Sequence, residues 1–214
     1  MSKAALEKLQ AKFPDAVLET HSDCGDDTAL VKPESWKAIC EWLRKDPQLD
    51  FDYLVDLCGV DYPDRQAQNQ RIEIVLHLCS ISKRHRLRLK ARVGTGEDEE
   101  LEGAEIDSVT SIWPGANWFE RETYDMLGVT FRGHPDMRRI LLYPEFVGHP
   151  LLKSYPAQRT QPLVEYRTEE EAGVPLEKQA PFSDDEGLAF GRNDYDRDVE
   201  DPRTKLNPQK TEAI

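Results

Sequence analysis

The chain has 214 residues, with 28 Lys and Arg against 41 Asp and Glu, which gives a net charge of −13 at pH 7. An acidic protein repels phosphate backbones at long range, so nucleic acid is not expected as its main partner. No apolar run approaches the ~18 residues that a membrane-spanning helix needs, and the first residues lack the apolar core of an export signal. The sequence therefore predicts no direct membrane span.

The first part of the chain predicts a helix, a strand and a second helix. The expected helices cover residues 1–13 and 33–43, and the strand covers residues 29–32. In both helices apolar residues recur every three or four positions, as an amphipathic helix requires. These residues are Leu6, Leu9 and Phe13 in the first helix, and Trp36, Ile39, Cys40 and Leu43 in the second.

Residues 51–60, 71–81 and 84–93 predict three strands, the last two joined as a hairpin by a short polar link. The third strand alternates strictly between cationic and apolar residues, so one of its faces is strongly cationic. A solvated edge and a partner for the protein's own acids are two interpretations of that face. Its cations are Arg84, Arg86, Arg88, Lys90 and Arg92.

A further helix is expected to begin at Pro114 and to end at Gly128, after a short approach over residues 108–113. One side of this helix is predicted to be apolar and the opposite side charged and exposed, beside two tryptophans. The apolar residues are Ala116, Phe119, Thr123, Met126 and Leu127; the charged ones are Glu120, Arg121, Glu122 and Asp125; the tryptophans are Trp113 and Trp118.

Two similar segments, 131–138 and 146–153, each contain Gly-His-Pro. Glycine permits a sharp bend and proline favours an extended residue before it, so His134 and His149 are expected on turns. Residues 138–143, between the two turns, predict a short strand with a cationic entrance.

The acids and histidines of this region leave a chemical interpretation open. Glu120 or Glu122 with His134 would suit the general acid and base of a stand-alone hydrolase, or a carboxylate and histidine metal site. The spacing favours instead a structural ion-pair network. Its expected members are Glu120, Arg121, Glu122, Arg138 and Arg139.

Two other patterns, the cysteines and a glycine pair, indicate neither a metal site nor a nucleotide site. The four cysteines contain no C-x-x-C pair, and Cys40, Cys58 and Cys79 stand in apolar surroundings, so buried thiols without a metal are expected. Gly94-Thr-Gly96 follows a strand as a phosphate-binding loop would. However, acidic residues follow it and a third glycine is missing, which argues against a nucleotide.

From Ala157 onward the composition changes to 14 acidic and eight basic residues with five prolines, and neither a helical nor a strand period is visible. Its apolar residues stand too far apart to make a core. We therefore expect a domain over residues 1–156 and an extended acidic arm over residues 157–214 that becomes ordered on another protein.

The string from Trp113 to Gly128, followed by His134 and by Arg138-Arg-Ile-Leu141, closely resembles the signature of the complex I thirty-kilodalton subunit. That family is also known as the C subunit of the proton-translocating NADH:quinone oxidoreductase. The resemblance covers roughly residues 25–156 and continues through Gly148-His149-Pro150-Leu151. It departs where the family usually has Arg, Lys and Asp, because this chain has Leu152, Lys153 and Ser154.

This resemblance implies an α+β domain, with a small mixed, largely antiparallel sheet and helices packed on it, that binds no cofactor and carries no catalytic residue. It implies a structural subunit of a respiratory hetero-oligomer, docked on the large hydrogenase-like subunit of the quinone site and beside iron–sulfur subunits. NADH, flavin, iron–sulfur clusters and a quinone such as ubiquinone would be bound by those partners.

The resemblance also implies a peripheral place at the cytoplasmic face of the bacterial inner membrane. The equivalent subunit of a membrane-bound hydrogenase or of a ferredoxin-dependent complex remains an alternative. The residues expected at subunit interfaces are Trp113, Trp118, Glu120, Arg121, Glu122, Asp125, His134, Arg138, Arg139 and His149.

Overall fold

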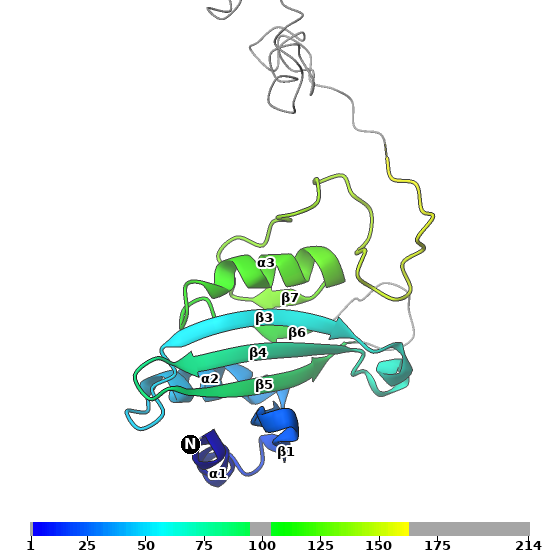
Figure 1. Ribbon diagram of the computed structural model, residues 1–214. Helices are drawn as coiled ribbons and strands as arrows, with labels where there is room; N and C mark the ends of the chain where they lie inside the picture. Colours follow the sequence, from blue (N-terminus) through cyan, green and yellow to red (C-terminus); the bar gives the residue numbers. More distant parts are fainter. Residues whose placement is uncertain (1, 95–103, 163–214) are drawn as a thin grey trace, which may run out of the picture. The chain divides into compact units, whose positions relative to one another are not determined.

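A five-stranded sheet forms the centre of the fold in the computed structural model, which describes residues 2–94 and 104–162. Its strand order is β1-β2-β5-β4-β3, antiparallel except between β2 and β5 (Figure 1). Two more strands, β6 and β7, form a parallel pair. The bounds are β1 Val17–His21, β2 Thr28–Val31, β3 Tyr53–Asp61, β4 Ile72–Ser80, β5 His85–Val93, β6 Glu105–Asp107 and β7 Thr130–Arg132. The predicted α+β class with a mixed, largely antiparallel sheet is confirmed.

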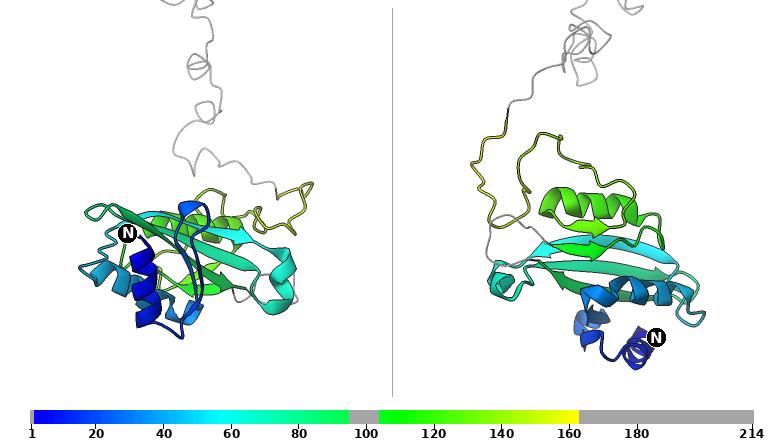
Figure 2. Two further views of the ribbon diagram at one scale, coloured as in Figure 1. Left: turned by 60° about the horizontal axis from the view of Figure 1, so that its bottom comes forward. Right: turned by 180° about the vertical axis from the view of Figure 1, so that it is seen from behind.

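Helix α2 covers one face of this sheet. It lies behind the strands in Figure 1 and in front of them in the reversed view of Figure 2. Its apolar side, as predicted from the sequence, is fully buried: Trp36, Ile39, Cys40 and Leu43 are all 0% exposed. The α-helices are α1 (Ser2–Lys12), α2 (Trp36–Lys45) and α3 (Ala116–Leu127), and the 3-10 turns are η1 (Asp23–Gly25), η2 (Pro33–Ser35) and η3 (Pro63–Gln68). None of the helices in the described part of the chain is long and apolar enough to cross a membrane.

The predicted hairpin is β4 and β5, which pair along their whole length from Ile72 opposite Val93 to Ser80 opposite His85. The alternation in β5 is as predicted, with His85 and the apolar side chains buried and Arg86, Arg88, Lys90 and Arg92 on the other face, whereas the predicted Arg84 lies in the turn before the strand. In β4 the residues on the α2 side are also buried, and they complete the core. These core residues are Ile72, Ile74, Leu76 and Leu78 in β4, and Leu87, Leu89, Ala91 and Val93 in β5.

Helix α3 packs closely on β3 because Gly59 has no side chain. A Cβ atom at Gly59 would lie 2.5 Å from Leu127 Cδ1 and 3.2 Å from Thr123 Cγ2. The helix ends at Gly128, which adopts φ +80° and donates its N–H to the carbonyl of Tyr124. The glycine thus provides the left-handed residue that commonly follows a helix.

The sequence prediction is wrong about one strand, missed three others, and includes two segments that lie outside the described residues. Residues 138–143 form no strand; residues 140–142 are bends whose N–H groups bond to a carboxylate of α3, as described below. The short strands β1, β6 and β7 were missed, because an alternation of apolar and polar residues cannot be recognised over only three to five positions. Residues 95–103, with most of the Gly94-Thr-Gly96 motif, and residues 163–214 of the predicted arm lie outside the described residues.

We expect Gly59→Ala to lower the free energy of unfolding by about 1 to 3 kcal/mol, because the added methyl group overpacks the contact with Leu127. Chemical denaturation monitored by circular dichroism measures this change. Gly115→Ala is the matched control, since a Cβ atom there meets nothing within 4 Å. Equal stability of both variants would contradict the close packing of α3 on β3.

Candidate docking surface

The carboxylate of Asp125, in α3, holds the irregular segment that follows β7. Its side chain is 0% exposed. Oδ2 accepts three consecutive backbone N–H groups at 3.0, 2.8 and 2.9 Å, and Oδ1 accepts Arg139 Nη1 at 2.7 Å. Burial alone would raise the pKa of Asp125, but these donors outweigh it and hold the pKa below its ordinary value. The three N–H groups belong to Ile140, Leu141 and Leu142.

The backbone carbonyl of Asp125 holds the second Gly-His-Pro turn. It accepts a hydrogen bond from His149 Nδ1 at 2.9 Å. The imidazole lies directly over the end of α3, because a Cβ atom at Gly128 would be 2.8 Å from His149 Cδ2. Burial lowers the pKa of His149, and the nearby Arg139 guanidinium lowers it further. Gly128 is therefore required both for its backbone angle and for this close approach.

Further bonds fix the segment over residues 138–152, which we call loop 138–152, along the side of α3. Arg121 donates to the carbonyls of Arg138 and Arg139 at 3.0 and 3.1 Å. Arg139 Nη2 donates to the carbonyl of Gly148 at 3.0 Å, and the N–H of Leu151 donates to the carbonyl of Met126 at 3.1 Å. The loop has neither helix nor strand, yet hydrogen bonds hold it at several points along its length.

The far end of loop 138–152 is tied to the sheet by a buried ion pair. Arg71 donates to both oxygens of Asp61 at 2.7 and 2.9 Å. The N–H of Lys153 donates to Asp61 Oδ2 at 2.7 Å, and Arg71 Nη2 donates to Ser154 Oγ at 3.0 Å. Leu152 is buried in the core. The departures from the family pattern at Leu152 and Ser154 are thus accommodated by apolar packing and by a neutral hydrogen bond.

This loop presents large apolar side chains outward. They were not singled out in the sequence, because apolar residues without a period in a segment rich in Gly and Pro indicate neither a core nor a surface. Trp118, on α3, is also exposed, at 66%. The exposed loop residues are Leu141 (62%), Tyr143 (36%), Val147 (45%) and Leu151 (57%).

Glu120, by contrast, supports the inside of the domain. Its carboxylate is 0% exposed and accepts Ser108 Oγ at 2.7 Å and the N–H of Val109 at 2.8 Å. Burial raises the pKa of Glu120 to about 7, and the two hydrogen bonds only partly oppose this rise. The residue therefore ties the segment before α3 to the helix.

The predicted exposed charged face of α3 is wrong for Glu120 and Asp125, which are both buried with partners inside the domain. Trp113 is buried as well and donates its indole N–H to the carbonyl of Phe51 at 3.1 Å. The helical period places residues on a side of α3 but does not indicate that neighbouring segments cover that side. Of the predicted interface residues, Trp118, Glu122 and Arg138 are exposed, and Arg121, Arg139 and His149 are half-buried.

The predicted ion-pair network also has different members. Arg139 pairs with Asp125 and Arg138 with Asp136, both at 2.7 Å, while Arg121 bonds to backbone carbonyls. Glu120 has no Arg partner within the described residues; its nearest basic group is His134 Nε2 at 4.0 Å. Carboxylates other than the expected ones therefore neutralise Arg138 and Arg139, whereas Arg121 donates to backbone carbonyls.

The hydrolase hypothesis required Glu120 or Glu122 to converge with His134 in an open pocket. The side chains of His134 and Glu120 are each 0% exposed. His134 Nδ1 accepts the N–H of Asp136 at 3.0 Å, and Nε2 donates to the carbonyl of Asn117 at 3.3 Å. Glu122 is exposed and stands about 200° around α3 from Glu120. This region therefore does not offer the pocket that the hypothesis needs.

All four cysteines are free thiols. Cys40 is buried, and its burial raises the pKa of the thiol far above the ordinary value, with Glu120 adding to the effect. Cys58 and Cys79 are half-buried, which is less than was predicted, and Cys24 is exposed. Within residues 2–94 and 104–162, no three His, Cys, Asp or Glu side chains are grouped so that they could hold a metal ion.

Residues 29–161 match the family described as respiratory-chain NADH dehydrogenase, 30 Kd subunit. A relative from Roseiflexus sp. (strain RS-1), the C subunit of NADH-quinone oxidoreductase, is 44% identical over 151 residues, which are 71% of this chain and 82% of the relative. The protein of that name from Geotalea uraniireducens is 40% identical over 154 residues, 72% of this chain and 87% of the relative.

Among solved structures, a chain of the membrane-bound sulfane sulfur reductase, an archaeal respiratory membrane complex, has a similar fold. Its TM-score is 0.59 at 22% sequence identity, and the match covers 73% of this chain and 86% of that chain. At that identity the likeness concerns the fold alone.

We expect Asp125→Asn to destabilise the domain by about 3 kcal/mol, because it leaves Arg139 without its charged partner in a largely buried site. The free energy of local opening, measured by amide hydrogen exchange at residues 140–142, should fall by at least as much as the free energy of global unfolding. Glu122→Gln on the exposed side of the same helix is the control. Unchanged exchange in Asp125→Asn would contradict the role of this carboxylate in holding the loop.

The raised pKa of Glu120 makes a second prediction. Since its folded pKa is about 7 and its ordinary value is 4.5, the stabilising contribution of its protonated form is present below pH 4.5 and is lost as the pH rises to about 7. Glu120→Gln removes this dependence. The stability of the variant relative to the native chain should therefore increase by about 3 kcal/mol between pH 4.5 and 7. Denaturation curves of both proteins across this range test it; a constant difference would contradict it.

Proposed function

The chain belongs to the family of the respiratory-chain NADH dehydrogenase 30 Kd subunit, and on that premise we propose that it is a non-catalytic structural subunit of a proton-translocating NADH:quinone oxidoreductase. In this proposal the domain docks on the large hydrogenase-like subunit of the quinone site. It contributes to electron transfer from NADH to quinone by keeping cofactor-bearing neighbours at fixed distances and orientations.

The observation that carries this proposal is the combination of rigidity and exposed apolar surface in loop 138–152. A loop without regular structure is fixed by Asp125, Arg139 and Arg71, yet its large apolar side chains face outward. Large apolar side chains held out from a domain surface commonly mark a protein interface, and a surface that hydrogen bonds already hold in place loses little entropy on binding. This arrangement suits permanent assembly.

The hydrogen bonds of the buried polar side chains support a structural role. Glu120, Asp125 and His134 all hold neighbouring segments of the same domain. We propose accordingly that NADH, flavin, iron–sulfur clusters and quinone are bound by partner subunits, including the iron–sulfur subunits beside this one. The complex would place the chain peripherally at the cytoplasmic face of the bacterial inner membrane.

The equivalent subunit of a related respiratory complex is the second candidate, and the fold shared with the archaeal chain favours it. The relatives that are 40% to 44% identical are named as the C subunit of NADH-quinone oxidoreductase, so an NADH-driven complex is better supported. Purification of the native complex and assay of NADH oxidation would separate the two, because only the first requires an NADH-oxidising module.

The double substitution Leu141→Asp and Leu151→Asp is expected to lower co-purification of the large subunit by about tenfold, because it places two charges in an apolar contact. A tagged chain expressed in the native host, followed by quantitative mass spectrometry, measures the loss. Leu18→Asp, at an exposed leucine of β1, serves as the control. Normal assembly of a folded double variant would overturn the proposed docking site.

A further inference from the structure

The face of strands β3, β4 and β5 that turns away from α2 carries no described α-helix. It is the near side of the sheet in Figure 1, and the reversed view in Figure 2 shows α2 on the other side. We call this surface the outer sheet face. The strand pairing arranges it in three rows: Arg86, Arg88, Lys90 and Arg92 on β5; Cys79, His77, Val75 and Glu73 opposite them on β4; and Tyr53, Asp56, Cys58 and Val60 on β3.

The β5 row has more positive charge than its own acids neutralise. Glu73 accepts from Lys90 at 2.9 Å and from Arg92 at 3.3 Å, and it also accepts from Arg65 at 2.8 Å. Three cations thus share one carboxylate. Arg88 pairs with Asp26 at 2.5 Å. The interpretation of these cations as partners of the protein's own acids is therefore confirmed for three of the five predicted ones.

Two cations at the hairpin end have no such partner. Among residues 2–94 and 104–162, no carboxylate lies within ion-pair distance of Arg84 or Arg86, and both side chains are exposed. This excess of positive charge stands out in a chain whose net charge is −13. Two exposed, unneutralised cations on an acidic protein will attract an anionic segment of another molecule.

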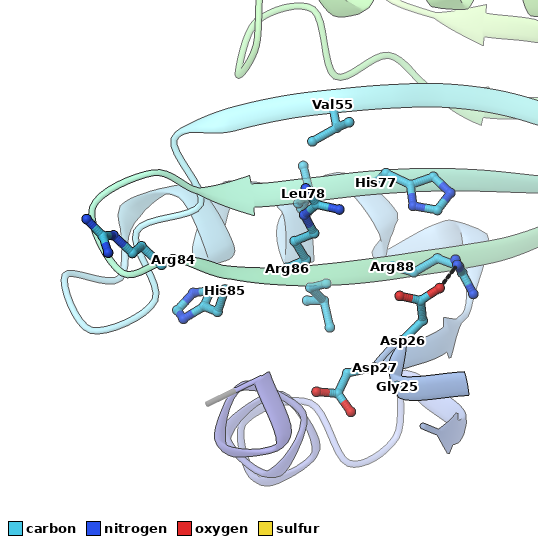
Figure 3. A pocket seen from close by; sticks show the side chains of 11 residues that line it. Gly25, Asp26, Asp27, Val55, His77, Leu78, Arg84, His85, Arg86 and Arg88 are labelled. Carbon is cyan, nitrogen blue, oxygen red and sulfur yellow. Dashed lines mark hydrogen bonds and ion pairs between the residues drawn. The ribbon is translucent and has the colours of Figure 1, made fainter. Parts of the chain in front are cut away.

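A hollow of about 510 Å³ adjoins these arginines. Figure 3 shows Arg86 reaching from β5 over β4, with Val55 beyond it on β3, His77 and Arg88 farther along the strands, and Asp26 paired with Arg88. The exposed side chains of Tyr53, Val55 and Val60 extend the apolar part of the surface along β3. The outer sheet face thus combines a line of cations, an apolar row and a recess for a side chain.

We propose that the outer sheet face binds an extended segment of a partner protein whose carboxylates stand at alternate positions. Residues two apart on β5 are separated by about 6.8 Å, and the same spacing separates alternate side chains of an extended segment. Neighbouring carboxylates of the segment then meet Arg84 and Arg86, while an apolar side chain of the segment enters the hollow beside Val55. This contact is separate from loop 138–152 and does not depend on the proposed docking of that loop.

A protein segment fits this surface better than an anionic membrane does. Asp26 and Asp56 stand on either side of the β5 and β4 rows, so a flat layer of phosphates would meet negative as well as positive charge. An extended segment can instead place its carboxylates at Arg84 and Arg86, where no described acid lies within ion-pair distance. The net charge of −13 also repels an anionic membrane at long range.

Two labelled peptides of identical composition, each long enough to span β5, test the proposal on the full-length chain. In one, Asp alternates with Thr and a single Leu; in the other, the Asp residues form one block. Fluorescence anisotropy at low salt should give about tenfold tighter binding of the alternating peptide, with affinity falling as salt rises. Equal binding of the two peptides, or no binding of either, would refute the alternating geometry.

The double variant Arg84→Gln/Arg86→Gln should bind the alternating peptide about tenfold more weakly. Arg44→Gln/Lys45→Gln on α2 makes the same change in net charge elsewhere and should leave the affinity unchanged. Melting curves check that each variant is folded, and the single variant Arg86→Gln, at an exposed residue, replaces the double if that one is unstable. Equal weakening by both double variants would overturn the proposal.

The same proteins distinguish other occupants. If the native chain sediments with phosphatidylglycerol vesicles while Arg84→Gln/Arg86→Gln does not, this result would assign the face to lipid. Self-association that the same double variant loses would assign the face to a second copy. Either result would overturn the proposed partner segment. Absence of both effects, with selective binding of the alternating peptide, supports it.

Discussion

The buried carboxylate of Asp125 is the interaction on which the candidate docking surface depends. A charge in the interior is tolerated only when donors surround it, and here Arg139 and three consecutive N–H groups do so. The same bonds decide the path of a segment that has no helix or strand to hold it. Polar anchoring thus adds to the apolar core, which the segment reaches through Leu152, and it leaves the exposed apolar side chains of loop 138–152 available to a partner.

Helix α3 carries two buried acids whose environments differ in one respect. Asp125 has a guanidinium at 2.7 Å and a lowered pKa, whereas Glu120 has neutral donors and a pKa of about 7. Hydrogen bonds from a hydroxyl and an amide satisfy the geometry of Glu120 without offsetting the cost of burying its charge. The charge of Asp125 is therefore compensated where it lies, whereas the burial of Glu120 costs least when this acid is protonated.

The two proposed contact surfaces lie on different parts of the domain and use different physics. Loop 138–152 offers apolar side chains on a rigid backbone, which suits permanent assembly. The outer sheet face offers cations in excess of their own acids, which suits recognition of a charged segment and gives a salt-dependent contact. A subunit that touches two neighbours through such surfaces can set their relative orientation without taking part in the electron transfer itself.

The sequence alone determined the periodic elements and the family. The alternation in β5, the apolar face of α2 and the end of α3 at Gly128 are all local patterns, and each was confirmed. It could not show that Glu120 and Asp125 are buried, because the helical period is blind to segments that arrive from elsewhere in the chain. The N–H groups that bind Asp125 lie 15 to 17 residues away. Only the tertiary structure brings them together, since an irregular loop takes its path from its anchors and not from its own pattern.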